Sequence, residues 1–230
     1  MALRVLREAA GVLSPSKVVA DRFAAWGIDM RVLPHGVEPT AAGVGVEPAD
    51  GPIVVAVAAR LNAGKQVHWV IRAVAELAAV RPMELRIMGG GPEEEPLRQL
   101  AKRLGVNATF TGQVPRAEVL RNLREAHIFA LPSVSETFGL AYVEAALSGC
   151  AVIATQGTGM DGLFADGEEM LFQDGTFEHF RAALRSLIAD DSRRVAMARR
   201  ARERATKEYL WDAVMHRYET SYASATAARS

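Results

Sequence analysis

From Pro52 onward, short runs of apolar and β-branched residues alternate with longer stretches in which apolar residues recur every three or four positions. This alternation is typical of βαβ units, in which helices join consecutive strands of a parallel sheet. Most of the short runs are apolar throughout, as expected of strands that are buried on both faces. The predicted strands are Ile53–Ala58, Glu84–Met88, Ala108–Phe110, Ile128–Leu131, Ala151–Ala154 and Met170–Phe172. The pattern therefore predicts an α/β fold, a parallel sheet with helices on both faces.

The stretches between these strands carry one apolar stripe each, at the spacing of an α-helix, and each is long enough for a crossover. The stripes are Val67, Val70, Ile71, Val74 and Leu77, then Leu97, Leu100 and Leu104, and then Val119, Leu120 and Leu123. After Thr176 the chain is predicted to be almost wholly helical. A stripe at Phe180–Ile188 is followed by a basic, alanine-rich helix around Arg193–Arg204 and by a last stripe from Trp211 to Tyr222.

The first fifty residues do not follow this pattern. They predict a helix fragment, a short strand near Gly11–Leu13, a helix from Pro15 to Trp26 and a second short strand at Arg31–Leu33. These elements are too few for a closed domain. Pro34–Gly51 is rich in Gly, Pro and Ala with little periodicity, which indicates a linker.

The composition is that of an ordinary globular protein with one large domain and an appendage. Of the 230 residues, 50% are hydrophobic and 23% are charged, so the chain can bury a sizeable core. Lys and Arg total 27 and Asp and Glu total 27, a balance that argues against nucleic acid as a partner. No apolar run is long enough to cross a bilayer, and Arg4 and Arg7 interrupt the first apolar residues before a secretory segment forms. We therefore expect a cytoplasmic protein, with Cys150 inert in its core.

Two other kinds of site are weighed and set aside. The histidines are scattered and none pairs with Cys or a carboxylate at ligand spacing, so no metal site is predicted. Gly157–Gly162 formally fits the dinucleotide fingerprint G-x-G-x-x-G. That fingerprint needs a helix opening on its third glycine, whereas Asp166-Gly167 is a turn signal. A dinucleotide-dependent oxidoreductase is therefore the weakest hypothesis, and absence of binding to a nicotinamide cofactor would remove it.

A second glycine run follows the predicted strand Glu84–Met88 directly and consists of Gly89, Gly90 and Gly91. One interpretation is a tight strand-to-helix turn that requires positive φ. The other is backbone without side chains that lets a ligand approach the carboxyl end of the strand, where open α/β sheets place their sites. The sequence favours neither.

Arg60 and Lys65 follow the first strand of the predicted sheet. Two cations at that place could clamp a diphosphate without a metal, because Arg supplies a planar fork and Lys a point charge. The alternative is a solvated helix start. Cations there oppose the helix dipole, and this small penalty favours a binding role.

Residues 131–149 hold the largest number of candidate groups. A strand ends at the start of this segment, a loop carries Glu136, and a helix begins around Phe138–Gly139. Amide groups at that helix start would attract a phosphate, and Glu144 in the second turn could accept hydrogen bonds from the vicinal hydroxyls of a ribose. Alternatively, Glu136 caps the helix and Glu144 is solvated. The neighbours of Glu144 are apolar, however, and a buried acid needs a partner.

Glu136 and Glu144 resemble the E-x7-E signature of retaining, GT-B-fold glycosyltransferases of family 4. The resemblance covers nearly the whole chain. Elements in the family's order are Ala58–Leu61 with Lys65, Gly89–Pro92, Phe110–Gly112, Leu131–Ser133, Glu144–Ala145 with Gly149, and Val152–Thr155. Upstream, Leu13–Ser16 and Pro34–Val37 resemble the last strand of the family's N-terminal domain and the crossover into its C-terminal domain.

The resemblance implies a nucleotide-diphosphate sugar, such as a UDP-, GDP- or ADP-sugar, as the donor, and transfer with retained anomeric configuration without a metal or other cofactor. By this similarity, Arg60 and Lys65 would neutralise the diphosphate. Glu144 would hold the ribose, and Glu136 would contact the transferred sugar. Fixed cations and helix amides would stabilise the charge that develops on the leaving diphosphate.

Backbone groups also have implied roles. The amides expected to bind sugar hydroxyls and phosphate are those of Phe138, Gly139 and Leu140. The residues expected to leave room for the nucleotide are Gly89, Gly90 and Gly91. Two departures from the family's pattern affect the sugar end of the site. Gln66 stands where the family commonly has Gly, and Gly157–Asp161 lacks the usual Pro before the acid.

The chain is too short for the two Rossmann-like domains of the GT-B fold. We expect residues 1–50 to be a remnant of the N-terminal domain with a linker, residues 51–208 to be the Rossmann-like donor-binding domain, and residues 209–230 to be a crossover helix. The missing N-terminal domain would supply the acceptor site, so the isolated chain is expected to be inactive or weakly active. Trp211 and Tyr218 would normally pack on that half, and the apolar patch left exposed is expected to drive self-association.

The alternative function is a non-catalytic nucleotide-sugar binding module or subunit that works with a separate N-domain chain. For both functions, the sequence does not identify the acceptor. If the acceptor is a lipid, the protein is expected to lie at the inner face of the membrane.

Overall fold

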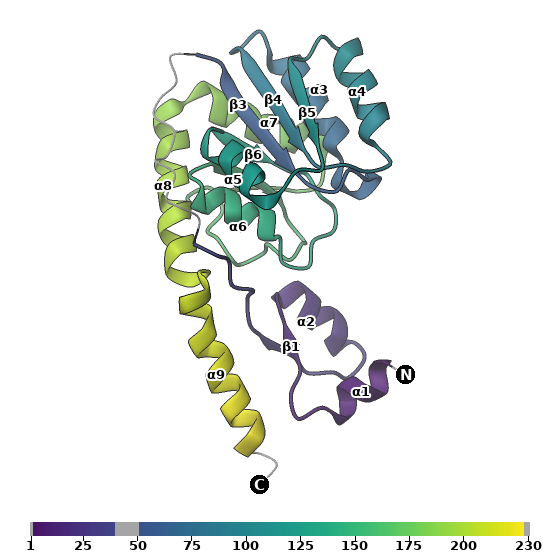
Figure 1. Ribbon diagram of the computed structural model, residues 1–230, viewed down its shortest axis with the longest axis vertical. Helices are drawn as coiled ribbons and strands as arrows, with labels where there is room; N and C mark the ends of the chain where they lie inside the picture. The colour runs from purple at the N-terminus through teal and green to yellow at the C-terminus, as the bar shows by residue number, and fades with distance from the viewer. Residues whose placement is uncertain (1, 40–50, 228–230) are drawn as a thin grey trace.

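A parallel sheet lies at the centre of the larger part of the chain (Figure 1). The computed structural model describes residues 2–39 and 51–227. Six strands follow each other across this sheet in the order β5-β4-β3-β6-β7-β8. They are β3 (Ile53–Ala58), β4 (Met83–Met88), β5 (Ala108–Gly112), β6 (Ile128–Ala130), β7 (Ala151–Thr155) and β8 (Leu171–Gln173). All the predicted strands of this sheet are confirmed, with small shifts at their ends.

The order of the strands reverses next to β3. The chain moves outward from β3 to β4 and β5, then returns to the other side of β3 and moves outward again through β6, β7 and β8. β3 pairs with β4 from Ile53↔Met83 to Ala58↔Met88, so these two strands end at the same level. In open α/β sheets, such a reversal leaves a crevice at the carboxyl ends of the strands, where ligands bind.

Helices cover both faces of the sheet, as the apolar stripes predict (Figure 1). They are α3 (Val67–Leu77), α4 (Glu94–Arg103), α5 (Arg116–Arg124), α6 (Leu140–Leu147), α7 (Phe177–Ala189) and α8 (Asp191–Glu208). α3 packs against α4 and α7, whereas α6 packs against α5 and α8. This arrangement confirms the predicted α/β fold with a Rossmann-like parallel sheet.

The core lies between the sheet and these two layers of helices. The side chains of Val55, Val57 and Ile71 are fully buried there. Cys150 is also fully buried, and its burial raises the pKa of the thiol. A thiol that stays protonated is a poor nucleophile, so Cys150 is the inert core residue that the sequence predicts.

The N-terminal residues form a small separate unit that lies apart from the large sheet in Figure 1. Its elements are α1 (Ala2–Glu8), β1 (Leu13–Ser14), α2 (Lys17–Ala24) and β2 (Arg31–Val32), and β1 pairs with β2 in parallel. The strand predicted near Gly11–Leu13 therefore lies slightly further along the chain. Ser14, the second residue of β1, is buried and donates a hydrogen bond from its hydroxyl to the carbonyl of Ser16, the N-cap of α2.

The predicted linker Pro34–Gly51 falls largely outside the described residues. Its first residues contact the C-terminal helix α9 (Trp211–Ala227) and the residue pair before it. The amide of Val37 donates to the carbonyl of Tyr209 at 2.7 Å, and a Cβ on Gly36 would lie 2.4 Å from the Trp211 ring. The Tyr218 hydroxyl reaches the carbonyl of Pro34 at 3.5 Å. The crossover and the last helix thus hold each other in place.

α9 continues beyond the end of α8 and away from the sheet (Figure 1), and some of its apolar side chains are exposed. Trp211 is 36% exposed, Met215 44% and Tyr222 64%. Exposed apolar residues on this helix are what the sequence leads us to expect, and self-association through them stays a prediction. None of the helices in the two described ranges has both the length and the apolarity to cross a bilayer.

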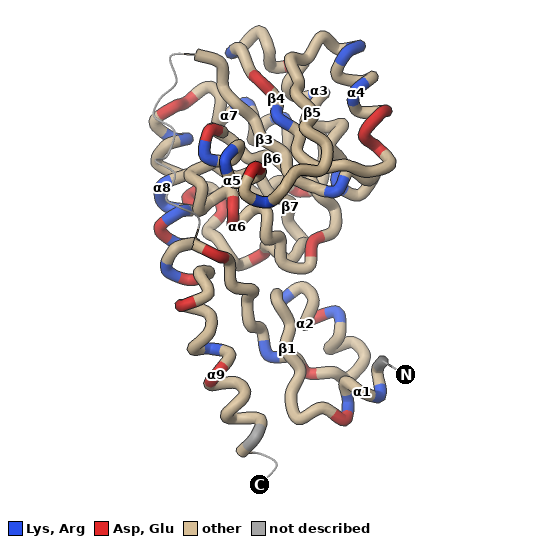
Figure 2. Tube along the Cα trace, viewed as in Figure 1, with Lys and Arg blue, Asp and Glu red and all other residues tan. Residues whose placement is uncertain are grey.

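Charged residues of both signs are distributed over the helices (Figure 2). On α8, basic and acidic side chains follow one another along the helix, and at its end Glu208 accepts a hydrogen bond from Arg217 of α9. α8 carries more basic than acidic residues, as the sequence predicts, so the equal totals of the whole chain are not repeated within this helix.

Candidate functional site

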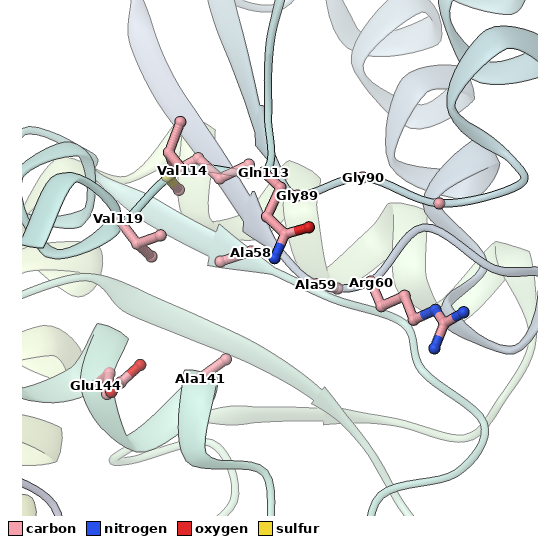
Figure 3. Close-up of a pocket in the computed structure, with 12 residues that line it drawn as sticks. Ala58, Ala59, Arg60, Gly89, Gly90, Gln113, Val114, Val119, Ala141 and Glu144 are labelled. Carbon is pink, nitrogen blue, oxygen red and sulfur yellow. The ribbon is translucent and has the colours of Figure 1, made fainter. Parts of the chain in front are cut away.

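A cavity of about 600 Å³ opens at the carboxyl ends of β3 and β4 (Figure 3). The residues after β3 and β4 form one wall, and α6 forms the opposite wall from across the point where the strand order reverses. The cavity is lined by Ala58, Ala59, Arg60, Met88, Gly89, Gly90, Gly91, Gln113, Val114, Val119, Ala141 and Glu144. The fold therefore brings Arg60, the glycine run and Glu144 together, although they are far apart in the sequence.

The glycine run is needed for close packing of two backbone segments. A Cβ on Gly89, whose φ is +126°, would lie 1.9 Å from the carbonyl oxygen of Ala59. A Cβ on Gly91 would lie 2.2 Å from the carbonyl oxygen of Leu61. The turn interpretation therefore accounts for these two glycines. Gly90 has no such backbone contact, and approach of a ligand stays the prediction for it.

Lys65 and Glu136 contact each other directly. Lys65 ends the short 3₁₀ helix η1 (Ala63–Lys65), and its Nζ lies 2.7 Å from Oε1 of Glu136 in the loop after β6. Their side chains are 20% and 14% exposed, so this is a largely buried ion pair. The resemblance places the two residues at neighbouring parts of a donor, but the sequence does not predict this contact. It also leaves open whether Glu136 caps α6, and the structure excludes that role because the N-cap is Gly139, without a side-chain cap.

Gln66, which follows Lys65, adopts a left-handed conformation with φ 48° and ψ 35°. Among the described residues it is the only non-glycine with positive φ. Such a conformation costs a side-chain-bearing residue on the order of 1 kcal/mol. This is a physical reason for glycine to be common at this position in the family that the sequence resembles.

The start of α6 combines an exposed residue, Leu140, with a buried one, Phe138. Gly139 has φ +87°, and a Cβ there would lie 2.6 Å from the sulfur of Met160. The Phe138 ring is buried and packs edge-on against His35 and Tyr209, at centroid distances of 5.3 and 6.1 Å. The helix begins one residue later than predicted, at Leu140, which is 47% exposed. The first amides of a helix have no partner within it, so this end can receive an anion.

Tyr142 fixes α6 to the end of β6. Its hydroxyl donates to the carbonyl of Leu131 at 2.8 Å. Burial raises the pKa of this phenol well above its usual range, and the charge of Glu136 adds to the effect. Tyr142 is therefore a neutral hydrogen-bond donor that positions the helix start.

The loop Gly157–Gly162 supports the Glu136 loop. Residues 156–163 form turns throughout, so the helix that a dinucleotide fingerprint requires at Gly162 is absent from this fully described stretch. The amide of Gly159 instead donates to the carbonyl of Glu136 at 2.9 Å, and a Cβ on Gly159 would lie 2.3 Å from the backbone of Thr137. Gly159 thus serves loop packing, whereas Gly157 and Gly162 adopt the positive φ that their turns require.

Glu144 forms an ion pair with Arg116, a residue that the sequence did not single out. Its side chain is 15% exposed, and its Oε1 accepts a hydrogen bond from Nε of Arg116 at 2.8 Å. A partner for Glu144 is therefore confirmed. Arg116 is the first residue of α5, and a cation at a helix N-terminus is the signal that identifies Lys65 and could have identified Arg116 too. By contrast, Arg60 is exposed, and within the described ranges no hydrogen bond or ion pair engages its guanidinium.

A parallel sheet whose strand order reverses beside a cavity defines the class of Rossmann-like α/β domains, and solved structures identify it as the C-terminal domain of the GT-B fold. Anabaena HepE in complex with UDP and glucose matches 96% of this chain and 66% of its own, with a TM-score of 0.83 and 22% identity. The C-terminal domain of the glycosyl transferase group 1 family protein LpcC from Francisella tularensis matches 76% of this chain and 100% of its own, with a TM-score of 0.68 and 22% identity. At these identities the likeness shows the fold alone.

The particular family follows from the sequence. Residues 45–204 match the family described as glycosyl transferases group 1, and the chain belongs to this family. The D-inositol 3-phosphate glycosyltransferase of Corynebacterium glutamicum is 36% identical over 184 residues, which are 76% of this chain and 44% of the relative. The chain therefore spans less than half the length of this relative.

Proposed function

We propose that this chain is the donor-binding domain of a retaining GT-B glycosyltransferase of family 4, and that its donor is a nucleotide-diphosphate sugar. One observation carries the proposal: Arg60 and Glu144 line one cavity of about 600 Å³ at the carboxyl ends of the strands. The Lys65–Glu136 ion pair and the open start of α6 follow β3 and β6 at the same edge of the sheet, although they do not line the cavity itself. Each group matches one part of such a donor. The presence of UDP and glucose in HepE, which has the same fold, supports this class of ligand.

The donor would extend across the cavity from Glu144 to Glu136. The free oxygen of Glu144 would accept hydrogen bonds from the ribose, and Arg60 would bind the diphosphate as a planar fork. Lys65 already touches Glu136, so it would lie between the phosphate and the transferred sugar. These two cations would supply the positive charge that the leaving diphosphate needs, without a metal.

The acceptor site would belong to an N-terminal domain, of which residues 1–50 would form a part. We infer this from the two-stranded β1–β2 sheet, because a pair of strands is marginal on its own. Residues 51–208 would then be the donor-binding domain, and residues 209–230 the helix that crosses back. The isolated chain would bind its donor but transfer the sugar slowly or not at all. With a lipid acceptor, the whole protein would work at the inner face of the membrane.

A thermal-shift screen with UDP, GDP, ADP and their sugar conjugates tests this proposal, with NAD as the reference ligand. A ligand that binds only the native state at a hundred times its Kd stabilises it by about 2.7 kcal/mol. We expect one of the three bases to raise the Tm clearly and NAD to leave it unchanged.

The variant Arg60→Ala should weaken binding of that nucleotide at least tenfold, because the diphosphate loses its planar partner. Arg103→Ala is the matched control, since Arg103 is an exposed arginine in the last turn of α4, remote from the end that follows the glycine run. If none of the nucleotides shifts the Tm, or if both variants bind alike, the proposed donor site is wrong.

A further inference from the structure

We propose that Arg116 is a positioning residue of the donor site, which holds the Glu144 carboxylate in the orientation that binds the ribose hydroxyls. This inference rests on the proposed function. Arg116 does not line the cavity itself, whereas Glu144 does. Arg116 would therefore act on the ligand through Glu144.

The ion pair occupies only one of the two carboxylate oxygens. Nε of Arg116 donates to Oε1 of Glu144 at 2.8 Å, and no other hydrogen bond to this carboxylate comes from the described residues. Figure 3 shows the Glu144 side chain projecting from α6 beside Ala141, on the wall opposite Ala58. Glu144 lines the cavity, and its Oε2 is not among the fully buried atoms without a partner, so we infer that this second oxygen is the one available to a ligand. Arg116 thus fixes Oε1 of Glu144, and Oε2 stays available to a ligand.

Two features of Arg116 favour a positioning role over that of an ordinary charged surface residue. It stands at the first position of α5, where a cation opposes the helix dipole and so destabilises the helix slightly. Its carboxylate partner is only 15% exposed, whereas most surface pairs join two exposed side chains. Because α5 packs against α6, the pair also joins the two helices on this side of the cavity.

The physical benefit is preorganisation. A glutamate side chain on a helix samples several rotamers, and only some of them direct an oxygen toward a ligand. A charge-assisted hydrogen bond from Arg restricts this sampling before the donor arrives, so less conformational entropy is lost on binding. The benefit should therefore appear only with ligands that carry the hydroxyls that Glu144 binds.

The test compares UDP, GDP and ADP with their 2′-deoxy forms, using the full chain and isothermal titration calorimetry. We expect the wild-type protein to bind the ribose form of its nucleotide about tenfold more tightly than the deoxy form. In Arg116→Ala, affinity for the ribose form should fall five- to tenfold while affinity for the deoxy form changes less than twofold. The ratio between the two forms should thus approach one.

Two further variants make the result specific. Arg121→Ala is the matched control, because Arg121 is an exposed arginine of the same helix that pairs with Glu118 at 3.4 Å. It should leave both affinities unchanged. In a Glu144→Gln background, Arg116→Ala should have no further effect on the ratio, because the two residues act as one unit.

An unchanged ratio in Arg116→Ala would overturn the inference, and so would tighter binding of the ribose form, which would make Arg116 a competitor of the ligand. In both cases the wild-type protein still binds its nucleotide, so the proposed function stands. If the wild-type protein binds none of the nucleotides, the proposed function fails and this inference fails with it.

Discussion

The large sheet and the β1–β2 pair are both parallel, yet only the large sheet closes a core around itself. β3 is buried from Ile53 to Val57, whereas both residues of β2 are exposed. A parallel sheet needs cover on both faces, and the small unit leaves Trp26 53% and Val32 39% exposed. The difference predicts that residues 51–208 fold by themselves, whereas the N-terminal unit is only marginally stable, because it buries little of its apolar surface.

The largest expected effect comes from removing one aromatic ring in each part. Phe129 of β6 is fully buried and packs edge-on against Tyr142 at 5.4 Å. Phe129→Ala should lower the free energy of unfolding by about 3–5 kcal/mol, because it leaves a cavity in a closed core. Trp26→Ala should lower it by less than about 1 kcal/mol, since its ring is already half in water.

Guanidinium chloride denaturation followed by far-UV circular dichroism measures both changes. If Phe129→Ala does not fold, Phe129→Leu tests the same point with a smaller loss. Equal losses in Phe129→Ala and Trp26→Ala would contradict the comparison, because they would show that the N-terminal unit has a closed core too.

A second expected effect depends on pH and again separates the two parts. His127 is 7% exposed, and its Nδ1 accepts a hydrogen bond from the amide of Val54 at 3.0 Å. Burial, with the nearby charges of Arg194 and Arg81, lowers the pKa of His127 to about 4. The unfolded chain takes up this proton near pH 6.5, so the native state loses stability as the pH falls from 6.5 toward 4. The loss should reach about 3 kcal/mol at the lower end.

The control for this effect is His35, an exposed histidine next to the N-terminal unit. The free energy of unfolding of the wild type and of His35→Asn should decline in parallel between pH 6.5 and 4. His127→Asn should decline less, because Asn can accept the Val54 hydrogen bond without titrating. If all three proteins decline alike, His127 is not the group responsible.

The large sheet could be predicted from the sequence because each strand and helix has its own pattern of apolar residues within a short stretch of chain. A strand such as Ile53–Ala58 is apolar at every position, since both of its faces are covered, and a stripe such as Val70–Val74 marks one face of a helix. The placement of Arg60 and Glu144 at the carboxyl edge of the sheet could be predicted as well, and both line the cavity there. Each is placed by the element just before it, a strand end or a helix start.

The contacts inside the site could not be predicted in this way. Glu144 and Arg116 are 28 positions apart, and Lys65 and Glu136 are 71 apart. Whether such residues touch depends on how the connections after three strands fold over one edge of the sheet, and no local pattern encodes that. The sequence therefore predicts which charged residues lie at this edge of the sheet, but only the structure shows which of them form ion pairs.

The smallest expected effect compares two helix caps. Thr176 caps α7 by accepting a hydrogen bond from the amide of His179 at 3.3 Å, and Ser16 caps α2 by accepting one from the amide of Val19 at 3.4 Å. Loss of such a cap typically costs about 1 kcal/mol of helix stability. Because α7 belongs to the closed core, Thr176→Ala should lower the free energy of unfolding of the whole domain by about this amount. Ser16→Ala should leave that transition unchanged and speed amide hydrogen exchange only within α2, as expected of a locally unfolding unit. A global loss in Ser16→Ala would instead show that the N-terminal unit unfolds together with the large sheet.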